Sequence, residues 1–413
     1  MTNRGAGRAS AVPSPSVPRR DVIVVGGGPA GVASATFLRR RGHDVLLLDA
    51  ARFPRDKVCG EGVSPEAWRL LDRLDAARAV RALHPHPLRG MAVTAPDGTT
   101  FRGEYGAARD PGFAVPREEL DQALLACART AGVEVRERSR VTALRLEDGR
   151  VAGVEIETER GPETCAARLV VGADGRRSRV ARSLGLLHEH ARLRKFAVRG
   201  YWDGVAGLEE HGEMHVAAGG YCGIAPLSAT RANVTFVVGR LDIRAAGGDL
   251  ERFYRDSIAA RWPRVGERLS RARLLSCPRA VGPLALVARR VSAPGVVLVG
   301  DAAGFYDPFT GEGVTLALRT AELAAEEADR ALSRGRTDDL RGYDRRRREA
   351  TRDKFRLNRL LQGVVAVPEL SNFVARRLSR RPDLAHRLVG IAGDLVPART
   401  ALGLGFVYEL LAG

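Results

Sequence analysis

A glycine-rich turn near the start of the chain restricts its fold more than any other feature. Residues 22–25 are all apolar and run directly into Gly-Gly-Gly-Pro-Ala-Gly at residues 26–31, a G-x-G-x-x-G pattern. An apolar-periodic helical segment follows, and then a second strand-like run from Asp44 to Leu48 that ends in Asp49. This order of strand, glycine turn, helix and strand predicts a dinucleotide-binding βαβ unit of an α/β fold.

Each position of this turn has a physical role. Gly26 permits the tight bend, Gly28 lets the backbone approach a pyrophosphate, and Gly31 lets the helix pack on the strand. Asp49 is suitably placed for a ribose hydroxyl. Ala30 lies inside the same turn and is counted with these residues as part of the expected cofactor site.

A second apolar run, at residues 296–299, leads into Gly300-Asp301 and a glycine-rich bend that ends near Gly313. A strand ending in Gly-Asp can present a carboxylate to a polyol. A helix starting near Gly313 points unpaired N–H groups at whatever lies before it. A flavin has both needs, because its ribityl chain carries hydroxyls and its pyrimidine edge becomes anionic on reduction.

A third motif follows the apolar run at residues 169–171 and contains Asp174-Gly175. Alone, it reads as an ordinary Asp-Gly turn after a strand. Three strand-to-glycine motifs in one chain favour a shared role, because ligands of open α/β sheets bind at the carboxyl ends of the strands. We therefore expect all three motifs to face one crevice.

The amino-acid composition indicates the class of protein and its cellular compartment. The chain has 413 residues, of which 45% are hydrophobic, enough for two packed domains, and no apolar run approaches the roughly 20 residues of a membrane span. Residues 1–20 lack an apolar core and predict a disordered arm rather than an export signal. Five scattered cysteines without a C-x-x-C suit a reducing cytoplasm.

The net charge of +17 comes almost entirely from arginine and is concentrated at the two ends of the chain. Nucleic-acid binding is disfavoured, because only 5% of residues are aromatic and no binding module is visible. The run Arg345–Arg348 predicts a solvated helix face, with contact to an anionic membrane surface or an acidic substrate as the alternative. The histidine pairs lack ligand spacing, so we predict no metal site.

At this point the motifs resemble a known group. Their order is similar to that of the FAD-dependent monooxygenase and reductase superfamily with the aromatic-hydroxylase fold. The segment Phe53–Gly62, which reads Phe-Pro-Arg-Asp-Lys-Val-Cys-Gly-Glu-Gly, resembles the geranylgeranyl reductase family more specifically, as does Asp307–Gly313. The resemblance covers about residues 20–330.

The resemblance implies a Rossmann-like FAD-binding domain with an inserted, mainly antiparallel β substrate domain and a C-terminal helical region. The segments expected are 21–89, 117–185 and 280–330 for the FAD-binding domain, 90–116 and 186–279 for the substrate domain, and 331–413 for the helical region.

The resemblance also implies which residues hold FAD. Arg117 would lie along the FAD chain and Asp301 near the ribityl or pyrophosphate. Only one dinucleotide fingerprint is present, so NAD(P)H is expected to bind transiently as the electron donor. The cofactor-binding residues expected are Gly26, Gly28, Ala30, Gly31, Asp49, Arg117, Asp174, Gly300, Asp301, Pro308, Gly311, Gly313 and Val314.

The substrate pocket departs from the family pattern. The family's Tyr-x-Trp-x-Phe-Pro is replaced by Tyr-Cys-Gly-Ile-Ala-Pro at residues 221–226, so the pocket floor is altered. Tyr221, Phe305 and Tyr201 are the expected substrate contacts. The tryptophan motif of the related flavin halogenases is absent, and no lysine lies where their catalytic lysine is expected, which disfavours halogenation.

The family implies a reaction in which NAD(P)H reduces FAD and the flavin then reduces a carbon–carbon double bond of an isoprenoid or other lipophilic metabolite. Cys59 and Glu61 are candidates for substrate contact or proton delivery. A monooxygenase acting on an aromatic or polyketide-like substrate remains the alternative, and a non-catalytic flavin-binding module is a third reading. The sequence carries no signal for a particular oligomeric state.

Overall fold

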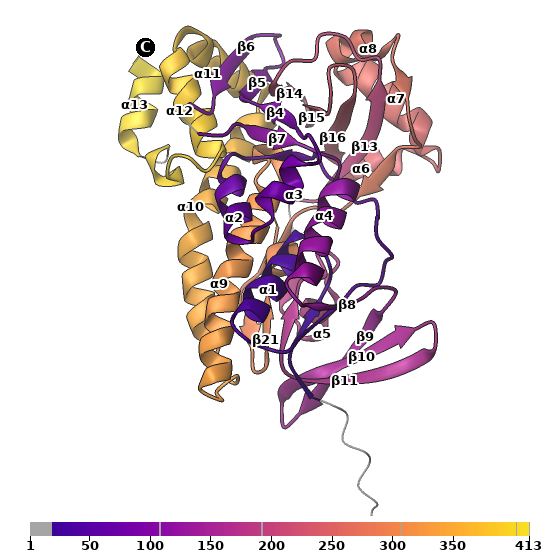
Figure 1. Ribbon diagram of the computed structural model, residues 1–413. Coiled ribbons are helices and arrows are strands. Elements are labelled where there is room, and N and C mark those ends of the chain that lie inside the picture. Colours follow the sequence, from indigo (N-terminus) through magenta and orange to yellow (C-terminus); the bar gives the residue numbers. More distant parts are fainter. Residues whose placement is uncertain (1–18, 107–108, 191–192, 306, 402, 413) are drawn as a thin grey trace, which may run out of the picture.

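Figure 1 shows a computed structural model of the chain. Most of the arm expected over residues 1–20 lies outside the described residues. The expected disorder is wrong for Arg19 and Arg20, because they form the beginning of strand β1 (Arg19–Val25) and pair with Ala166 and Ala167. The structure describes residues 19–106, 109–190, 193–305, 307–401 and 403–412.

The first sheet has a parallel centre. Its order is β20-β21-β11-β1-β2-β8, and β9 and β10 extend it as antiparallel strands beside β11. The central strands are continuous apolar runs, since α1, α4 and α9 pack beside them and both faces are buried. The remaining bounds are β2 (Val45–Leu48), β8 (Glu134–Arg136), β9 (Arg140–Glu147), β10 (Arg150–Thr158), β11 (Gly161–Gly172), β20 (Ser292–Ala293), β21 (Val296–Leu298), α1 (Pro29–Arg40), α2 (Glu66–Arg73), α3 (Ala77–Arg81), α4 (Arg117–Thr130), α5 (Arg179–Ser183) and α9 (Gly313–Ser333).

The second sheet has the order β17-β13-β16-β15-β14-β5-β6 and is antiparallel except where β5 joins β14. Helices α6 to α8 cover it, and Trp202, Phe236, Tyr254 and Trp262 fill the space between. Strand β18 also pairs with β13, so this sheet extends past residue 279. The bounds are β5 (Gly90–Thr94), β6 (Thr100–Glu104), β13 (Lys195–Asp203), β14 (His211–Ala217), β15 (Gly220–Pro226), β16 (Ala232–Gly239), β17 (Arg273–Leu274), β18 (Arg279–Val281), α6 (Arg240–Arg244), α7 (Leu250–Arg261) and α8 (Pro263–Leu269).

The C-terminal helices pack on the outer strand β6 of the second sheet and beside α9 (Figure 1). Within the described ranges, no helix is both long and apolar enough to cross a membrane. The expected mixed α/β class is confirmed. The bounds of these helices and of the two small sheets are α10 (Arg341–Ala366), α11 (Pro368–Arg380), α12 (Pro382–Ala392), α13 (Leu404–Ala412), β3 (Gly62–Val63), β4 (His86–Leu88), β7 (Gly112–Ala114), β12 (Leu187–Glu189) and β19 (Leu286–Ala288).

Candidate functional site

The three glycine motifs lie at the carboxyl ends of three neighbouring parallel strands. Strand β1 leads into Gly26, β11 into Asp174 and β21 into Gly300. A Cβ added to Gly26 would lie 2.5 Å from the carbonyl oxygen of Ala173, and one added to Gly300 would lie 2.8 Å from the Cβ of Ala30. The motifs therefore contact one another at one edge of the sheet, as ligand sites of this fold require.

The first turn leaves room for a ligand only beside Gly28. Gly31 packs tightly, because a Cβ there would lie 1.8 Å from the carbonyl oxygen of Gly26. A Cβ on Gly28 would meet only Arg55 Nη2, at 3.6 Å. Gly28 caps the N-terminus of α1 without a side-chain hydrogen bond, so the first N–H groups of this helix face the open side. A pyrophosphate fits this position.

Asp49 holds the turn in place. Its Oδ2 accepts a hydrogen bond of 2.7 Å from the Gly27 N–H, and its Oδ1 accepts one of 2.7 Å from the Ala51 N–H. A carboxylate offers about four lone-pair sites, so about two remain for ribose hydroxyls. The ribose contact stays a prediction that this geometry allows.

Basic side chains surround the open side of the turn. Burial lowers the pKa of Lys57; the charge of Asp301 opposes that shift, and Arg117, Arg55 and Arg176 lower the pKa further. Burial likewise lowers the pKa of Arg176, which Asp301 again opposes. Lys57 thus lies close to three arginines and to the Asp301 carboxylate. An additional anion would be stabilised here.

Arg117 begins helix α4 and is almost fully buried. It forms a bidentate pair with Asp121, with Nε–Oδ1 at 2.9 Å and Nη2–Oδ2 at 2.8 Å. Arg55 Nη1 lies 3.1 Å from the same carboxylate but has no hydrogen bond of its own. A buried guanidinium N–H without an acceptor fits a missing anionic group such as the FAD pyrophosphate.

Asp174, the third acid expected at the cofactor site, forms hydrogen bonds within its own loop. Its carboxylate accepts from Ser178 Oγ at 2.5 Å and from the backbone N–H groups of Arg179 and Val180 at 2.7 and 3.2 Å. These bonds close the turn that precedes α5 and place Gly175 beside Lys57 Nζ. Its contact with a cofactor stays a prediction.

A small cavity of about 40 Å³ lies at the Gly300-Asp301 motif. Phe305 lines it and pairs with Leu286 of β19. Pro308 opens a short 3₁₀ turn, Gly311 follows with φ +68°, and α9 begins at Gly313, with Val314 buried just behind. The helix start predicted from the sequence is therefore present and faces the cavity.

A buried acid supports this loop from beneath. The Tyr221 hydroxyl donates to Asp307, Phe309 N–H donates to it at 3.0 Å, and Lys195 Nζ lies 3.7 Å away. Burial raises the pKa of Asp307 above its ordinary value, although Lys195 partly opposes the shift. Tyr221 is only 2% exposed, so it supports the Asp307–Gly313 loop from below; its contact with a substrate stays a prediction.

A second buried acid, Glu312, precedes α9 directly. Burial raises its pKa to about 8, while Lys354 of α10, whose Nζ lies 2.9 Å from Oε1, opposes the shift. Lys354 also contacts Asp394 at 3.1 Å and donates to the Ile391 carbonyl at 2.6 Å. The C-terminal helices are therefore attached to the start of α9.

Glu61 joins the two sheets. It is 1% exposed and accepts from the Arg117 N–H at 3.0 Å, from Asn233 Nδ2 at 3.0 Å and from the Tyr201 hydroxyl. Burial raises its pKa, and these donors oppose the rise. The carboxylate has a structural task, linking the Phe53–Gly62 segment to β13 and β16; its role in proton delivery stays a prediction.

Cys59 lies at the same junction. Its carbonyl oxygen accepts from Asn233 Nδ2 at 2.8 Å, and its Sγ is 3.4 Å from the Glu61 N–H. The thiol also interacts with the guanidinium of Arg117. Cys59 is thus close to the expected path of FAD, and its catalytic role stays a prediction.

The sequence reasoning missed several residues of the site. Arg176 follows Asp174-Gly175 directly, and Lys57 lies in the family-like segment, so both could have been found from the motifs. Asn233 could not, because nothing in its strand marks it. In the described part of the chain, no group of three or more His, Cys, Asp or Glu side chains has the geometry of a metal site.

The comparisons with known proteins agree with this geometry. A family model described as FAD binding domain matches residues 19–356. Menaquinone reductase of Mycolicibacterium smegmatis is 32% identical over 391 residues, which are 92% of each chain. The chain belongs to the geranylgeranyl reductase family of FAD-dependent oxidoreductases. Another relative, digeranylgeranylglycerophospholipid reductase of Methanosarcina mazei, is 31% identical over 322 residues, 76% of each chain.

Solved structures share the fold of this FAD-dependent oxidoreductase. A geranylgeranyl bacteriochlorophyll reductase-like protein from Thermoplasma acidophilum superposes with a TM-score of 0.74 at 23% identity, over 95% of this chain and 96% of the other. The flavin-dependent halogenase CmlS gives a TM-score of 0.79 at 24% identity, over 93% and 77%. At these identities the structures establish the fold and not the reaction.

Proposed function

We propose that this oxidoreductase uses NAD(P)H to reduce its FAD and then reduces a carbon–carbon double bond of an isoprenoid or similar lipophilic substrate. The observation that carries the proposal is the position of the Phe53–Gly62 segment. The segment brings Lys57 to the Asp301 motif and Cys59 to Arg117, and its sequence resembles that of the geranylgeranyl reductases. The relatives named above act on prenylated lipids or quinones by name, which agrees with a lipophilic substrate.

Different residues of the site would bind different parts of the cofactor. Bound FAD supplies the hydride chemistry, which the protein itself cannot provide. Gly28, Arg55 and Lys57 would hold the pyrophosphate, and Asp301 the ribityl chain. The N–H groups at the start of α9 would stabilise negative charge on the flavin ring, an effect of about 0.3–2 kcal/mol.

Reduction of an alkene also requires a proton. Cys59 is the candidate donor, because its thiol lies beside Arg117 and its loop is held by Asn233 and Glu61. The same contacts hold this loop against the second sheet. That sheet would form the other wall of the substrate site.

The test is an incubation of the FAD-loaded protein with NADPH and a geranylgeranyl substrate in the absence of oxygen. A product heavier by two hydrogens supports the proposal. A product that gains one oxygen, and only in air, would show a monooxygenase instead. Chemical reduction of the flavin with dithionite separates the two halves of the proposal, because it removes the need for a nicotinamide donor.

A further inference from the structure

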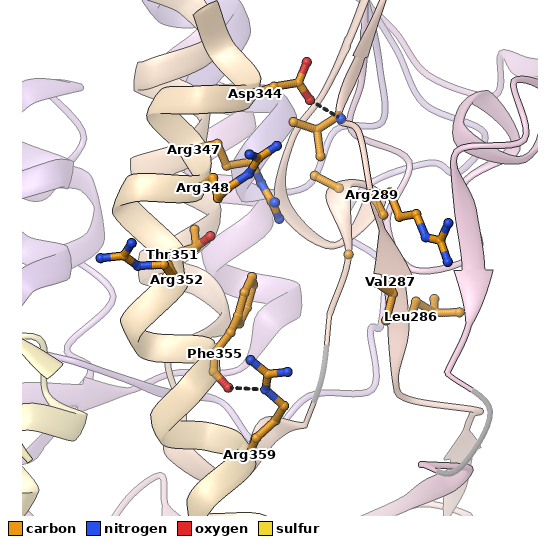
Figure 2. Close-up of a pocket in the computed structure, with 14 residues that line it drawn as sticks. Leu286, Val287, Arg289, Asp344, Arg347, Arg348, Thr351, Arg352, Phe355 and Arg359 are labelled. Carbon is orange, nitrogen blue, oxygen red and sulfur yellow. Dashed lines mark hydrogen bonds between the residues drawn. The ribbon is translucent and has the colours of Figure 1, made fainter. Parts of the chain in front are cut away.

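A second cavity lies between α10 and the segment from β19 to the Gly300–Ala303 turn, and Figure 2 shows its lining. It is an open groove of about 700 Å³, counting the space open to solvent. The guanidinium groups of Arg347, Arg348 and Arg359 project from α10 towards it, and the ring of Phe355 stands between them (Figure 2). Nothing in the site described above uses these side chains.

The groove is strongly cationic. Arg348 and Arg359 are exposed, and Arg347 is buried with its Cζ 5.9 Å from the Phe355 ring centre. Asp344 is the one carboxylate among the described lining residues. Its oxygens accept from the Val291 N–H at 2.6 Å and from the Ser292 hydroxyl, so it fastens the opposite wall to α10. Guanidinium groups along a groove favour phosphate, which each of them can bind with two hydrogen bonds.

The groove adjoins the cavity at the Gly300-Asp301 motif, since Gly304 and Phe355 line both. A ligand in the groove would therefore reach the residues next to Asp301. The chain has one dinucleotide fingerprint, and FAD accounts for it, so the phosphates of a second nucleotide need other groups. The Phe355 ring offers a face on which an adenine can stack.

We propose that Arg348 and Arg359 bind the phosphate groups of the NADPH donor, with the adenine against Phe355. This inference rests on the proposed function, in which a nicotinamide nucleotide reduces the flavin. It goes further by assigning the donor a place on α10, outside any Rossmann unit.

The test measures binding of adenosine 2′,5′-bisphosphate to the FAD-loaded protein by calorimetry, without any turnover. Arg348→Gln and Arg359→Gln should each weaken binding about tenfold, the value of one charge-assisted contact. Arg356→Gln is the matched control, because Arg356 is exposed on the same helix, pairs with Asp353 and does not line the groove. Unchanged FAD content shows that each variant is folded.

Equal binding by all three variants and the wild type would overturn the inference, as would an unmodified protein that does not bind the probe. Vesicles containing anionic phospholipid provide a second arm. Loss of vesicle binding in the two groove variants with nucleotide binding intact would assign the groove to a lipid headgroup and refute the donor site. If the probe binds as predicted but no alkene is reduced, the proposed reaction fails and the donor site stands.

Discussion

Gly28→Ala should separate cofactor binding from folding. The residue has φ −77° and ψ 179°, an extended conformation open to alanine, and the new Cβ would meet only Arg55 Nη2 at 3.6 Å. Gly-to-Ala changes at such positions stabilise a protein by about 0.4–1 kcal/mol, because the unfolded chain loses freedom. We therefore expect the FAD-free variant to unfold at the same urea concentration as the wild type or slightly above it.

FAD binding should change in the opposite direction. The new methyl group would lie where the pyrophosphate approaches α1. Moving the pyrophosphate away from the helix N-terminus costs about 0.3–2 kcal/mol of binding free energy, and steric crowding costs roughly 1–3 kcal/mol more. Together these predict FAD binding weaker by roughly 10- to 4000-fold, measured by the change in FAD fluorescence. Gly363→Ala in α10 is the control, because its Cβ would meet nothing within 4 Å. FAD affinity equal to the wild type in Gly28→Ala would refute the assigned path of the pyrophosphate.

Three further variants test other parts of the site. Glu61→Ala removes an acceptor shared by three donors, the Arg117 backbone N–H, the Asn233 amide and the partly buried Tyr201 hydroxyl, and should cost about 3 kcal/mol of unfolding free energy. The matched change at an exposed site, Glu155→Gln, should cost almost nothing, and equal urea midpoints would contradict the role of Glu61 as a link. The pKa of Glu312 is raised from 4.5 to about 8, so between these pH values the folded protein keeps a proton that the unfolded chain releases. The free energy of unfolding should therefore fall as the pH rises from 4.5 to 8, by at most about 1.4 kcal/mol per pH unit. Glu312→Gln should flatten that dependence in urea titrations at pH 5 and 8, and an unchanged slope would show that another group causes it. Asp301→Ala should lose FAD while its circular dichroism stays that of the wild type, and full retention of FAD would remove the ribityl assignment.

The sequence predicts the parts of the site that local chemistry dictates. A glycine that must pack against a carbonyl, as Gly31 does against Gly26, leaves a fixed pattern in the chain, and an apolar run before it marks the strand. Because parallel strands end at one edge, the meeting of the Gly26, Asp174 and Gly300 motifs also follows from these patterns.

The remaining features depend on contacts between distant residues. Glu61 is joined to Tyr201 and Asn233, which are 140 and 172 residues away in the sequence, and no local sequence pattern predicts such hydrogen bonds. The run Arg345–Arg348 was expected to form one solvated face, but consecutive helical residues point about 100° apart. Arg347 is buried while Arg348 lines the groove, so the run divides between the interior, the groove and the solvent.

The strand order of the first sheet has a consequence for how the protein is assembled. Val170 of β11 pairs with Val296 of β21, and α9 begins only at Gly313, so the cofactor edge cannot close until most of the chain has been synthesised. The second sheet instead contains β13 to β16, whose partners are mostly adjacent in sequence. Pairing between distant parallel strands is slow. We expect the second sheet to form early and FAD to enter last, as the ligand that holds the final strand and helix in place.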